Sequence, residues 1–351
     1  MKKLRMLLVL MLVLIMSALI SGCSKYIAVK KDAVQNTEIK TTEGETEISK
    51  IKEEQELESK YNIIVNEEDV AFTDGRGEQV TIKKNPQKVV CLYNSYLDIW
   101  DNCGGTVIGR VEESEEKPVE NAKSAEEVGT AGAPSLEKII ALQPDLVIMT
   151  TAYAEQREMI STLEKSNIQV LALDNDYIDD YLGTVKLFTA LTGREDLYEK
   201  QALEVKKNVE EIIKKAPEDK NYKVLLLFAT AKSLSVRDSN SMVGEMLEDL
   251  NTVNISDSEV ETADTKTFSM EKILQEDPDF IFVLTMGNDM EKIQERLKSD
   301  AEDNPAWASL TAVKEDRYIV LPKDIYMYKP NNRYPEAYEG LAEILYPEVF
   351  K

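Results

Sequence analysis

The stretch "SLEKIIALQPDLVIM", Ser135–Met149, contains a short helical pattern, a proline and an apolar strand pattern. Nearly the same phrase, "SMEKILQEDPDFIFV", begins 134 positions later at Ser269. Six of the fifteen aligned residues are identical, and most of the others exchange one apolar residue for another. The two copies therefore predict the same helix-to-strand corner twice, once in each half of the fold.

Each part of the repeated phrase has a physical role in such a corner. Ser135 and Ser269 suit helix N-caps. Glu137 and Glu271 then fall in the first helical turn, where the helix dipole favours a negative charge. The proline biases the residue before it away from the α region, which ends the helix, and the apolar tail suits a central strand. On these grounds both glutamates are equally well explained as ordinary first-turn residues.

Strand and helix patterns alternate along the rest of the chain, beginning with two short strands about a turn at Asp74–Gly77. This alternation predicts an α/β fold of two Rossmann-like lobes joined by one long α-helix, with a ligand cleft between the lobes. We expect an N-terminal α/β lobe over residues 61–193 and a C-terminal α/β lobe over 218–351. The charged pattern of 194–217 predicts an uninterrupted connecting helix that stops at Pro217.

The N-terminus has the form of an export signal. Lys2, Lys3 and Arg5 precede an apolar run at 6–20, which ends just before Cys23. Residues 1–22 are therefore expected to be a signal peptide. The ending "ISGC" resembles a bacterial lipoprotein signal, in which the cysteine carries the lipid. A plain signal peptide or a short anchor helix with an incidental cysteine is the alternative.

The segment that follows the signal, residues 23–60, is rich in Lys, Glu and Thr. Such a composition buries too little apolar surface to offset its ordering entropy, so we expect a flexible tether after lipidated Cys23. The protein is then extracytoplasmic and lipid-anchored to the cell membrane.

Charge and histidine content exclude several classes of function. The formal net charge of −23 makes nucleic acid a poor partner. The chain has no histidine, which removes Ser-His-Asp and Cys-His catalysis, the common zinc sites and histidine ligation of haem. We expect no cofactor and no metal site. A carboxylate pair or a lysine base would still permit an exported enzyme.

Cys91 and Cys103 are the remaining cysteines, too few for a disulfide framework in a chain of this length. Both lie in apolar or helical patterns, so two buried thiols are favoured. A single disulfide between them is the alternative that the sequence leaves open.

Several motifs, taken in their order along the chain, resemble those of one protein family. They are "NPQKVVCLYNSYLDIWDNCGGTVIGRV" (85–111), "VGTAGAPSLEKIIALQPDLVIM" (128–149), the mid-chain helix, "NPAWASLTAVKEDRYIVLP" (304–322) and the final "LYPE". With the lipoprotein signal, they resemble the class III substrate-binding lipoproteins of iron-siderophore, haem and cobalamin ABC importers, over nearly all of residues 72–348.

The resemblance implies a monomeric carrier, not an enzyme, that captures a ferric siderophore or a similar chelate and delivers it to an ABC permease. In that family each lobe presents one glutamate to arginines of the two-fold permease. The matching positions are Glu137 and Glu271, so the phrase would recur because a two-lobed carrier docks on a two-fold partner.

The ligand is then expected in the interlobe cleft, at the ends of strands. Tyrosines offer flat apolar faces with a polar tip, and Arg or Lys can hold the oxygens of a chelate. Any one tyrosine is also explained by burial in the core. The candidates are Tyr93, Tyr96, Tyr153, Lys232, Arg237, Met286, Tyr326, Tyr328, Lys329 and Arg333.

Two of these candidates are supported by their position in the chain as well as by their residue type. Arg237 and the segment Tyr326–Arg333 are each expected in a loop directly after an apolar strand. Trp100 and Trp307 occur in helical or turn patterns and are expected to be structural.

Other ligands and other classes of protein remain as alternatives. A haem- or corrinoid-binding carrier of the same family is one, with Met286 or a tyrosine as the axial ligand of haem. Free divalent metal is disfavoured because such carriers normally use several histidines. An exported enzyme that uses the cleft lacks GxSxG, a P-loop and histidine. A structural or adhesive lipoprotein would leave the paired phrase unexplained, and a neighbouring permease gene would argue against it.

Overall fold

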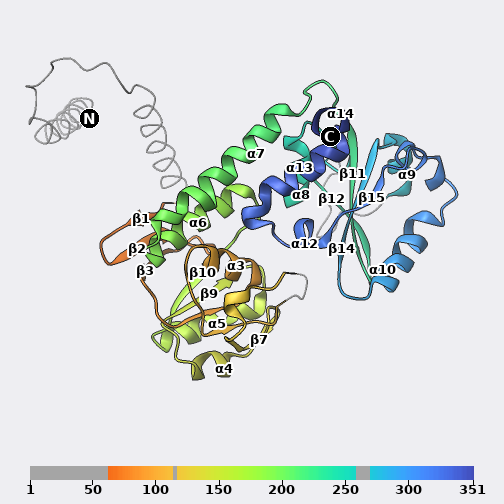
Figure 1. The fold of residues 1–351 in the computed structure, drawn as a ribbon. Coiled ribbons are helices and arrows are strands. Elements are labelled where there is room, and N and C mark those ends of the chain that lie inside the picture. The colour runs from red at the N-terminus through yellow and green to blue at the C-terminus, as the bar shows by residue number, and fades with distance from the viewer. Residues whose placement is uncertain (1–61, 114–116, 258–268) are drawn as a thin grey trace, which may run out of the picture. The chain divides into compact units, whose positions relative to one another are not determined.

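Figure 1 shows the computed structural model of the chain, which describes residues 62–113, 117–257 and 269–351. The predicted signal peptide, Cys23 and the predicted tether lie outside these described residues. In the described part of the chain, none of the helices has the length and apolar character needed to span a bilayer.

A five-stranded parallel sheet forms the centre of the first lobe, called here the N-terminal lobe. Its strand order is β10-β9-β4-β5-β6. The strands are β4 (Val89–Cys91), β5 (Gly109–Arg110), β6 (Glu126–Glu127), β9 (Leu146–Thr150) and β10 (Gln169–Leu173). The helices are α3 (Asn94–Asn102), η1 (Glu120–Ala122), α4 (Leu136–Ala141), α5 (Ala154–Lys165) and α6 (Ile178–Thr192).

Two small antiparallel sheets belong to the same lobe. One joins β7 (Gly129–Thr130) to β8 (Ala133–Pro134). The other has the order β1-β2-β3, with β1 (Ile64–Val65), β2 (Asp69–Thr73) and β3 (Gln79–Lys83). The predicted hairpin is therefore present. In its turn the Asp74 carboxylate accepts hydrogen bonds from the N–H groups of Arg76 and Glu78, and Gly77 adopts φ +77°.

The second lobe, the C-terminal lobe, is built on a mixed sheet of order β12-β11-β14-β15, with β13 also paired to β11. Its strands are β11 (Lys223–Thr230), β12 (Leu234–Arg237), β13 (Val253–Asn254), β14 (Phe280–Met286) and β15 (Tyr318–Val320). Only β12 among these described strands runs antiparallel to its neighbour. The two-lobed α/β fold predicted from the sequence is confirmed.

Short helices connect these strands and cover the sheet. They are α8 (Met242–Asp249), α9 (Met270–Glu276), α10 (Met290–Leu297), η4 (Lys298–Glu302), η5 (Trp307–Ser309), α11 (Thr311–Lys314), α12 (Lys323–Tyr326), η6 (Asn331–Arg333), α13 (Tyr334–Leu345) and α14 (Pro347–Phe350).

The repeated phrase forms the same corner in both lobes. The Ser135 side chain accepts a hydrogen bond from the Lys138 N–H at the start of α4. The Ser269 side chain accepts one from the Lys272 N–H at the start of α9. Both predicted N-caps are confirmed, and both helices carry their glutamate in the first turn. The strands that follow, β9 and β14, are buried almost throughout.

The end of each copy is also the same. The residues before the two prolines, Gln143 and Asp277, have φ values of 51° and 45°. Both are therefore left-handed, which breaks the right-handed helix one residue before the proline. The Asp277 carboxylate accepts hydrogen bonds from Thr311 and ties its corner to α11.

The segment between the lobes is helical but not uninterrupted as predicted. Gly193, at φ 67°, ends α6. A 3₁₀ turn, η2 (Glu195–Leu197), and a π turn, η3 (Glu199–Leu203), then lead into α7 (Glu204–Lys215). The Tyr181 hydroxyl donates to the Gln201 carbonyl within the π turn, and a side chain that inserts into the helical ladder is a known cause of such an irregularity. The domain boundaries at 61–193, 194–217 and 218–351 remain a prediction.

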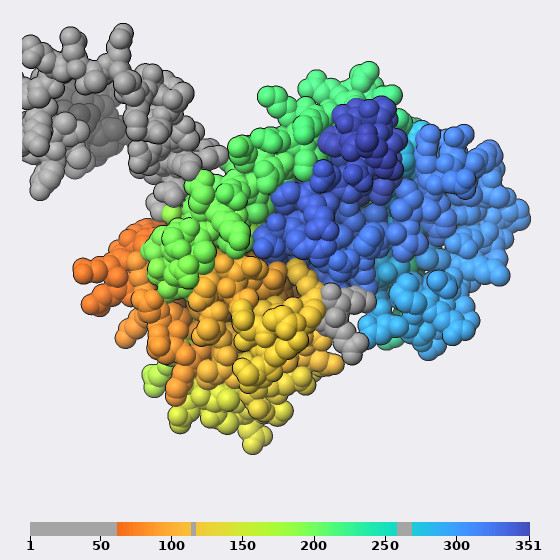
Figure 2. All heavy atoms as spheres, in the orientation of Figure 1, coloured from red at the N-terminus to blue at the C-terminus, as the bar shows by residue number. Residues whose placement is uncertain are grey.

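One hydrophobic cluster runs through both lobes. Alternate residues of β9, such as Leu146 and Ile148, face a cluster that also contains Phe188, Val209, Tyr338 and Phe282. The other face of each sheet packs against separate helices of its own lobe. α13 packs along α7, and Figure 2 shows their blue and green surfaces side by side. The lobes therefore share a core rather than only a linker.

The cysteines and tryptophans are structural in this fold. Cys91 and Cys103 are free and buried, as favoured from the sequence. Burial raises the pKa of Cys91 to about 12, so it remains a thiol at neutral pH. Trp100 packs edge-on against Phe188, and Trp307 is buried in the C-terminal lobe.

Asn331 forms a hydrogen-bonded joint between the lobes. Its side chain is 1% exposed, and its amide nitrogen donates to the Ser95 carbonyl at 3.0 Å and to the Asp98 carboxylate at 2.6 Å. Its amide oxygen lies 3.0 Å from the Ser95 hydroxyl. Lys117 lies 3.2 Å from the same Asp98 carboxylate. This buried polar network fixes η6 of the C-terminal lobe on α3 of the N-terminal lobe.

Removing the Asn331 side chain should destabilise the protein. We expect Asn331→Gly to lower the free energy of unfolding by about 1–3 kcal/mol, because buried partners lose their hydrogen bonds. Glycine keeps the left-handed backbone at φ 55° free of strain, so Asn331→Ala should cost slightly more. Urea denaturation followed by circular dichroism measures both. A glycine variant as stable as the wild type would show that the joint contributes nothing.

Glu245 lies at a second contact between the lobes. Its carboxylate accepts a hydrogen bond from the Ile178 N–H at the start of α6, and its Oε2 atom is buried without a hydrogen-bond partner in the described part of the chain. Burial first, and then the charges of Asp249, Asp179 and Asp180, raise the pKa of Glu245 to about 7. Folding therefore favours the protonated form of the Glu245 carboxyl group, compared with the unfolded chain.

This pKa makes a contribution to stability that depends on pH. The folded pKa lies above the ordinary value of 4.5, so the stabilising contribution is present at low pH and is lost as the pH rises through about 7. Glu245→Gln should therefore be more stable than the wild type at pH 8 by about 1 kcal/mol, discounted for partial exposure, and lose this advantage at pH 5. Urea denaturation at both pH values measures this. Glu248→Gln, on the exposed face of α8, is the control and should show no such difference.

Candidate functional site

A cavity of about 510 Å³ lies between the two lobes. Tyr93, which follows β4, and Asp176, which follows β10, form its N-terminal wall. Its C-terminal wall comes from β11, β12, β14, α8 and α12. The cavity therefore lies at the carboxyl ends of parallel strands of both sheets, where α/β folds bind ligands. Its volume is that of a small-molecule site.

Five of the ten predicted ligand-binding residues line this cavity. They are Tyr93, Arg237, Met286, Tyr326 and Lys329. Tyr96, Tyr153, Lys232, Tyr328 and Arg333 do not line it in this structure.

Tyr93 presents an aromatic face and a neutral hydroxyl to the cavity. Its ring contacts Tyr96 edge-on at 5.0 Å between centroids, and Tyr153 lies 6.4 Å away. Burial first, and then the neighbouring Tyr153 and acidic side chains, raise the pKa of Tyr93 to about 12. Tyr93 is therefore a hydrogen-bond donor at neutral pH. Tyr96 is 1% exposed, and its buried ring packs against the ring of Tyr93.

The sequence predicted that Arg237 and the segment Tyr326–Arg333 each lie in a loop directly after a strand, and this is wrong for both. Arg237 is the last residue of β12, and the segment begins at the end of α12 and ends in η6. Strand β12 pairs antiparallel with β11, with Arg237 opposite Leu226. This pairing places the guanidinium over the ring of Phe228, 4.2 Å from its centroid. Burial lowers the pKa of Arg237, opposed by the charge of Asp238, and arginine still remains charged at neutral pH.

Lys329 crosses the cleft. Its Nζ atom lies 2.9 Å from Oδ1 of Asp176 in the other lobe. Its backbone carbonyl accepts a hydrogen bond from Lys117 Nζ at 2.7 Å, again from the N-terminal lobe. Tyr177 adds a third link, since its hydroxyl donates to the Asn240 carbonyl at 2.8 Å. The loop after β10 and the segment after α12 are thus held together at the cavity wall.

Tyr326 and Met286 differ in how they reach the cavity. Tyr326 is 4% exposed, and its hydroxyl donates to the Ala337 carbonyl at 2.9 Å. It therefore offers the cavity an apolar edge of its ring. Met286, at the end of β14, is 48% exposed and is free to adjust to a ligand.

The remaining predicted residues have other partners or positions. Arg333 forms ion pairs with Asp324 at 3.0 Å and Glu336 at 2.7 Å, and so holds the start of α13 on α12. Lys232 lies exposed in the turn between β11 and β12. The ring of Tyr328 lies 5.4 Å from Nζ of Lys323. Tyr153 is the N-cap residue of α5.

The sequence reasoning missed much of the cavity wall. The residues that it missed are Asp176, Phe228, Asp238, Asn240, Ser241, Met242, Val243, Leu284 and Met327. Asp176 follows the strand pattern "QVLAL" and meets the same rule of position as Tyr93, so it was within reach of that reasoning. Phe228 and Leu284 lie inside strands, where the sequence does not distinguish a cavity wall from a core.

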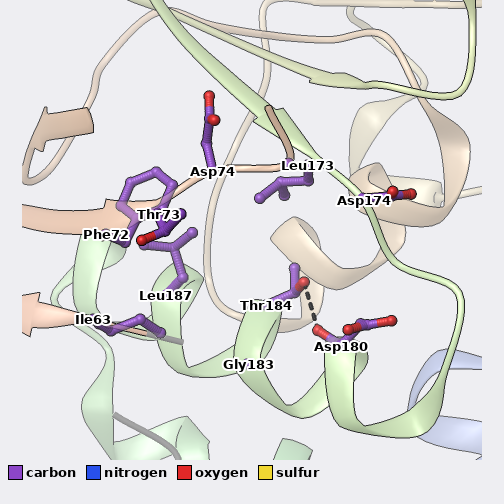
Figure 3. A pocket seen from close by; sticks show the side chains of 11 residues that line it. Ile63, Phe72, Thr73, Asp74, Leu173, Asp174, Asp180, Gly183, Thr184 and Leu187 are labelled. Atoms are coloured by element: carbon purple, nitrogen blue, oxygen red, sulfur yellow. Dashed lines mark hydrogen bonds between the residues drawn. The ribbon is translucent and has the colours of Figure 1, made fainter. Parts of the chain in front are cut away.

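A smaller cavity of about 130 Å³ lies behind the loop that carries Asp176. Figure 3 shows it between the end of β2, the end of β10 and α6. The Thr184 hydroxyl donates to the Asp180 carbonyl. The Asp180 carboxylate accepts hydrogen bonds from the N–H groups of Asp176 and Tyr177, at 2.9 and 3.0 Å. The Asp180 carboxylate therefore orders the 174–177 loop, and with it the wall of the larger cavity.

Glu137 and Glu271 are both exposed, each on the first turn of the helix in its own copy of the repeated phrase. In the part of the chain that the structure describes, no three His, Cys, Asp or Glu side chains gather in a way that could hold a metal ion.

Comparison with known proteins matches residues 89–325 to the family described as "Periplasmic binding protein". The Fe(3+)-citrate-binding protein YfmC of Bacillus subtilis is 27% identical over 70% of this chain and 76% of its own length. The uncharacterized ABC transporter substrate-binding lipoprotein YvrC of the same organism is 25% identical over 80% of this chain and 87% of its own. Staphylococcus aureus SirA, solved with staphyloferrin B, has a similar fold, with a TM-score of 0.64, 23% identity and coverage of 78% and 98%.

Proposed function

Because this chain belongs to the periplasmic binding protein family, we propose that it captures a ferric siderophore or a similar metal chelate outside the cytoplasm and delivers it to an ABC permease. The family and its relatives are solute-binding transport proteins and not enzymes. The observation that carries the proposal is the interlobe cavity of about 510 Å³, whose lining includes two tyrosines, two basic and two acidic side chains. Relatives named for Fe(3+)-citrate and for ferric anguibactin support iron chelates as the class of ligand.

The proposed ligand contacts are the cavity-lining residues among those predicted. Tyr93 would stack on the chelate and donate from its neutral hydroxyl. Arg237 would hold chelate oxygens with its planar guanidinium, which Phe228 keeps in place. Tyr326 and Met286 would pack against the apolar skeleton of the ligand.

Haem is the second candidate ligand, and one observation favours it. Met286 is exposed at the cavity and would be available as a thioether ligand to the iron. Haemin and a corrinoid therefore belong in any ligand panel.

We also propose that Cys23 carries a lipid and that residues 23–60 act as its tether. Relatives named as substrate-binding lipoproteins support this. The protein would then stay at the outer face of the cell membrane, near its permease.

The permease contact proposed for Glu137 and Glu271 rests on their equivalence. Each is exposed on the first turn of the same helix-to-strand corner, one in each lobe. Two such carboxylates would form charge-assisted contacts with arginines related by a two-fold axis, and so fix orientation as well as attraction.

Arg237→Ala should weaken binding of the cognate chelate by about 10-fold or more, because one charged hydrogen-bond donor is lost. Quenching of tyrosine and tryptophan fluorescence, titrated with ferric hydroxamates, ferric catecholates, ferric citrate, haemin and a corrinoid, measures the affinity. Lys232→Ala is the matched control, since Lys232 lies on the same hairpin outside the cavity, and it should bind like the wild type. Absence of saturable quenching by every member of the panel would refute a metal-chelate carrier.

The double variant Glu137→Arg with Glu271→Arg should abolish uptake of the chelate by cells that carry the permease, because both contacts become repulsive. Its affinity for the chelate should stay within about 2-fold of the wild type, because neither residue lines the cavity. Lys138→Glu with Lys272→Glu changes neighbouring charges on the same two helices and serves as a comparison. A parallel loss of affinity in the Glu137/Glu271 variant would contradict a docking role.

A further inference from the structure

The charges that line the cavity are balanced. Among the described lining residues, Asp176 and Asp238 are acidic, and Arg237 and Lys329 are basic. Their formal charges cancel. The cavity therefore lacks the excess of positive charge that a strongly anionic ligand would need to offset its desolvation.

The two walls of the cavity differ in the sign of their net formal charge. The described residues that form the N-terminal wall are Tyr93 and Asp176, and neither is basic. Asp174 lies two residues before Asp176, and its pKa is raised by burial first and then by Asp176 and Asp180. Several carboxylates thus lie close together behind this wall. Asp174 and Asp176 are both exposed, so their repulsion of an anion in the cavity is screened by water and acts at short range.

One of the two cations of the cavity, Lys329, is already paired with a carboxylate. Lys329 is bound to Asp176 at 2.9 Å across the cleft, and the Arg237 guanidinium rests on Phe228. An anionic ligand that recruited Lys329 would separate it from Asp176. The Asp176 carboxylate would then face the anion without its counter-charge, which is an arrangement that disfavours such a ligand.

The C-terminal wall is apolar and adaptable. Phe228 and Leu284 contribute rigid surface from inside strands, and Met242, Met286 and Met327 contribute three flexible thioethers. Methionine side chains adjust to irregular apolar shapes. This wall fits a ligand with an apolar outer surface better than one that presents charged oxygens on all sides.

Ferric chelates differ in net charge, so some classes of chelate suit the balanced charge of this cavity and others do not. Three hydroxamates carry one negative charge each and neutralise Fe³⁺, which leaves a neutral complex. Catecholates carry two each, so the tris-catecholate is a polyanion, and ferric citrate complexes are also anionic.

We infer that this cavity takes neutral ferric trihydroxamates in preference to polyanionic chelates, and that Asp176 is the residue that sets this preference. The inference rests on the proposed function, since it names the class of chelate for the same site. Asp176 acts both by its own charge and by holding Lys329.

Fluorescence titration of the full-length protein tests this. The ligands are a neutral ferric trihydroxamate, a ferric tris-catecholate and ferric citrate, at one fixed salt concentration. The wild type should bind the trihydroxamate at least about 10-fold more tightly than either anion. Asp176→Asn should tighten binding of both anions, relative to the trihydroxamate, by about 5-fold or more, because a repulsive charge is removed and Lys329 is released.

Asp219→Asn is the charge-matched control. Asp219 is exposed and does not line the cavity, so all three affinities should stay within about 2-fold. Circular dichroism establishes that each variant is folded. A purely structural Asp176 would shift all three affinities together and would refute its role in specificity.

The outcomes separate the inference from the proposed function. A wild type that prefers the tris-catecholate or ferric citrate overturns the inference and leaves a chelate carrier standing. A wild type that binds none of these three, nor haemin or a corrinoid, overturns the proposed function and the inference with it.

Discussion

The hydrophobic cluster that both lobes share holds the two sheets in their positions. It includes Leu146 and Phe188 of the N-terminal lobe, Val209 of α7 and Phe282 and Tyr338 of the C-terminal lobe. Separating the lobes would expose this apolar surface to water, which is unfavourable in proportion to the area exposed. The shared core therefore fixes the carboxyl ends of the two sheets opposite each other, and the buried Asn331 joint adds a polar link at the same place.

The cavity follows from that arrangement. Because both sheets direct their carboxyl ends to one cleft, the loops after β4 and β10 meet β12, β14 and the segment after α12. The lining of the cavity combines two acidic and two basic side chains with apolar ones, which is the basis of the preference inferred above for a small-molecule ligand of low net charge. In a transport cycle the same shared core would oppose a wide hinge motion, so that ligand release would depend on work done by the permease.

Local sequence patterns predicted some parts of the structure and the site, whereas features set by packing were missed. The repeated phrase predicted both corners, with Ser135 and Ser269 as caps, because N-cap chemistry and a proline stop are local. The same reasoning predicted Tyr93 at the cavity from its place after a strand. It failed to distinguish Tyr93, the N-cap residue of α3, from Tyr96 in the first turn of that helix, because which face of α3 meets the core is decided by packing. Arg237 lies on a strand because β12 pairs with β11, and short edge strands carry a weak pattern.

Local sequence patterns were enough to predict the fold class, the two copies of the corner and the position of strand ends, because periodicity, caps and breakers act over a few residues. The sequence also determined that histidine chemistry is absent. Three features became evident from the folded structure alone: which strand ends meet, the pairing of Lys329 with Asp176 across the cleft, and the stacking of Arg237 on Phe228. These pairs join residues far apart in the chain, and their contact is set by the packing of whole lobes, which no local pattern encodes.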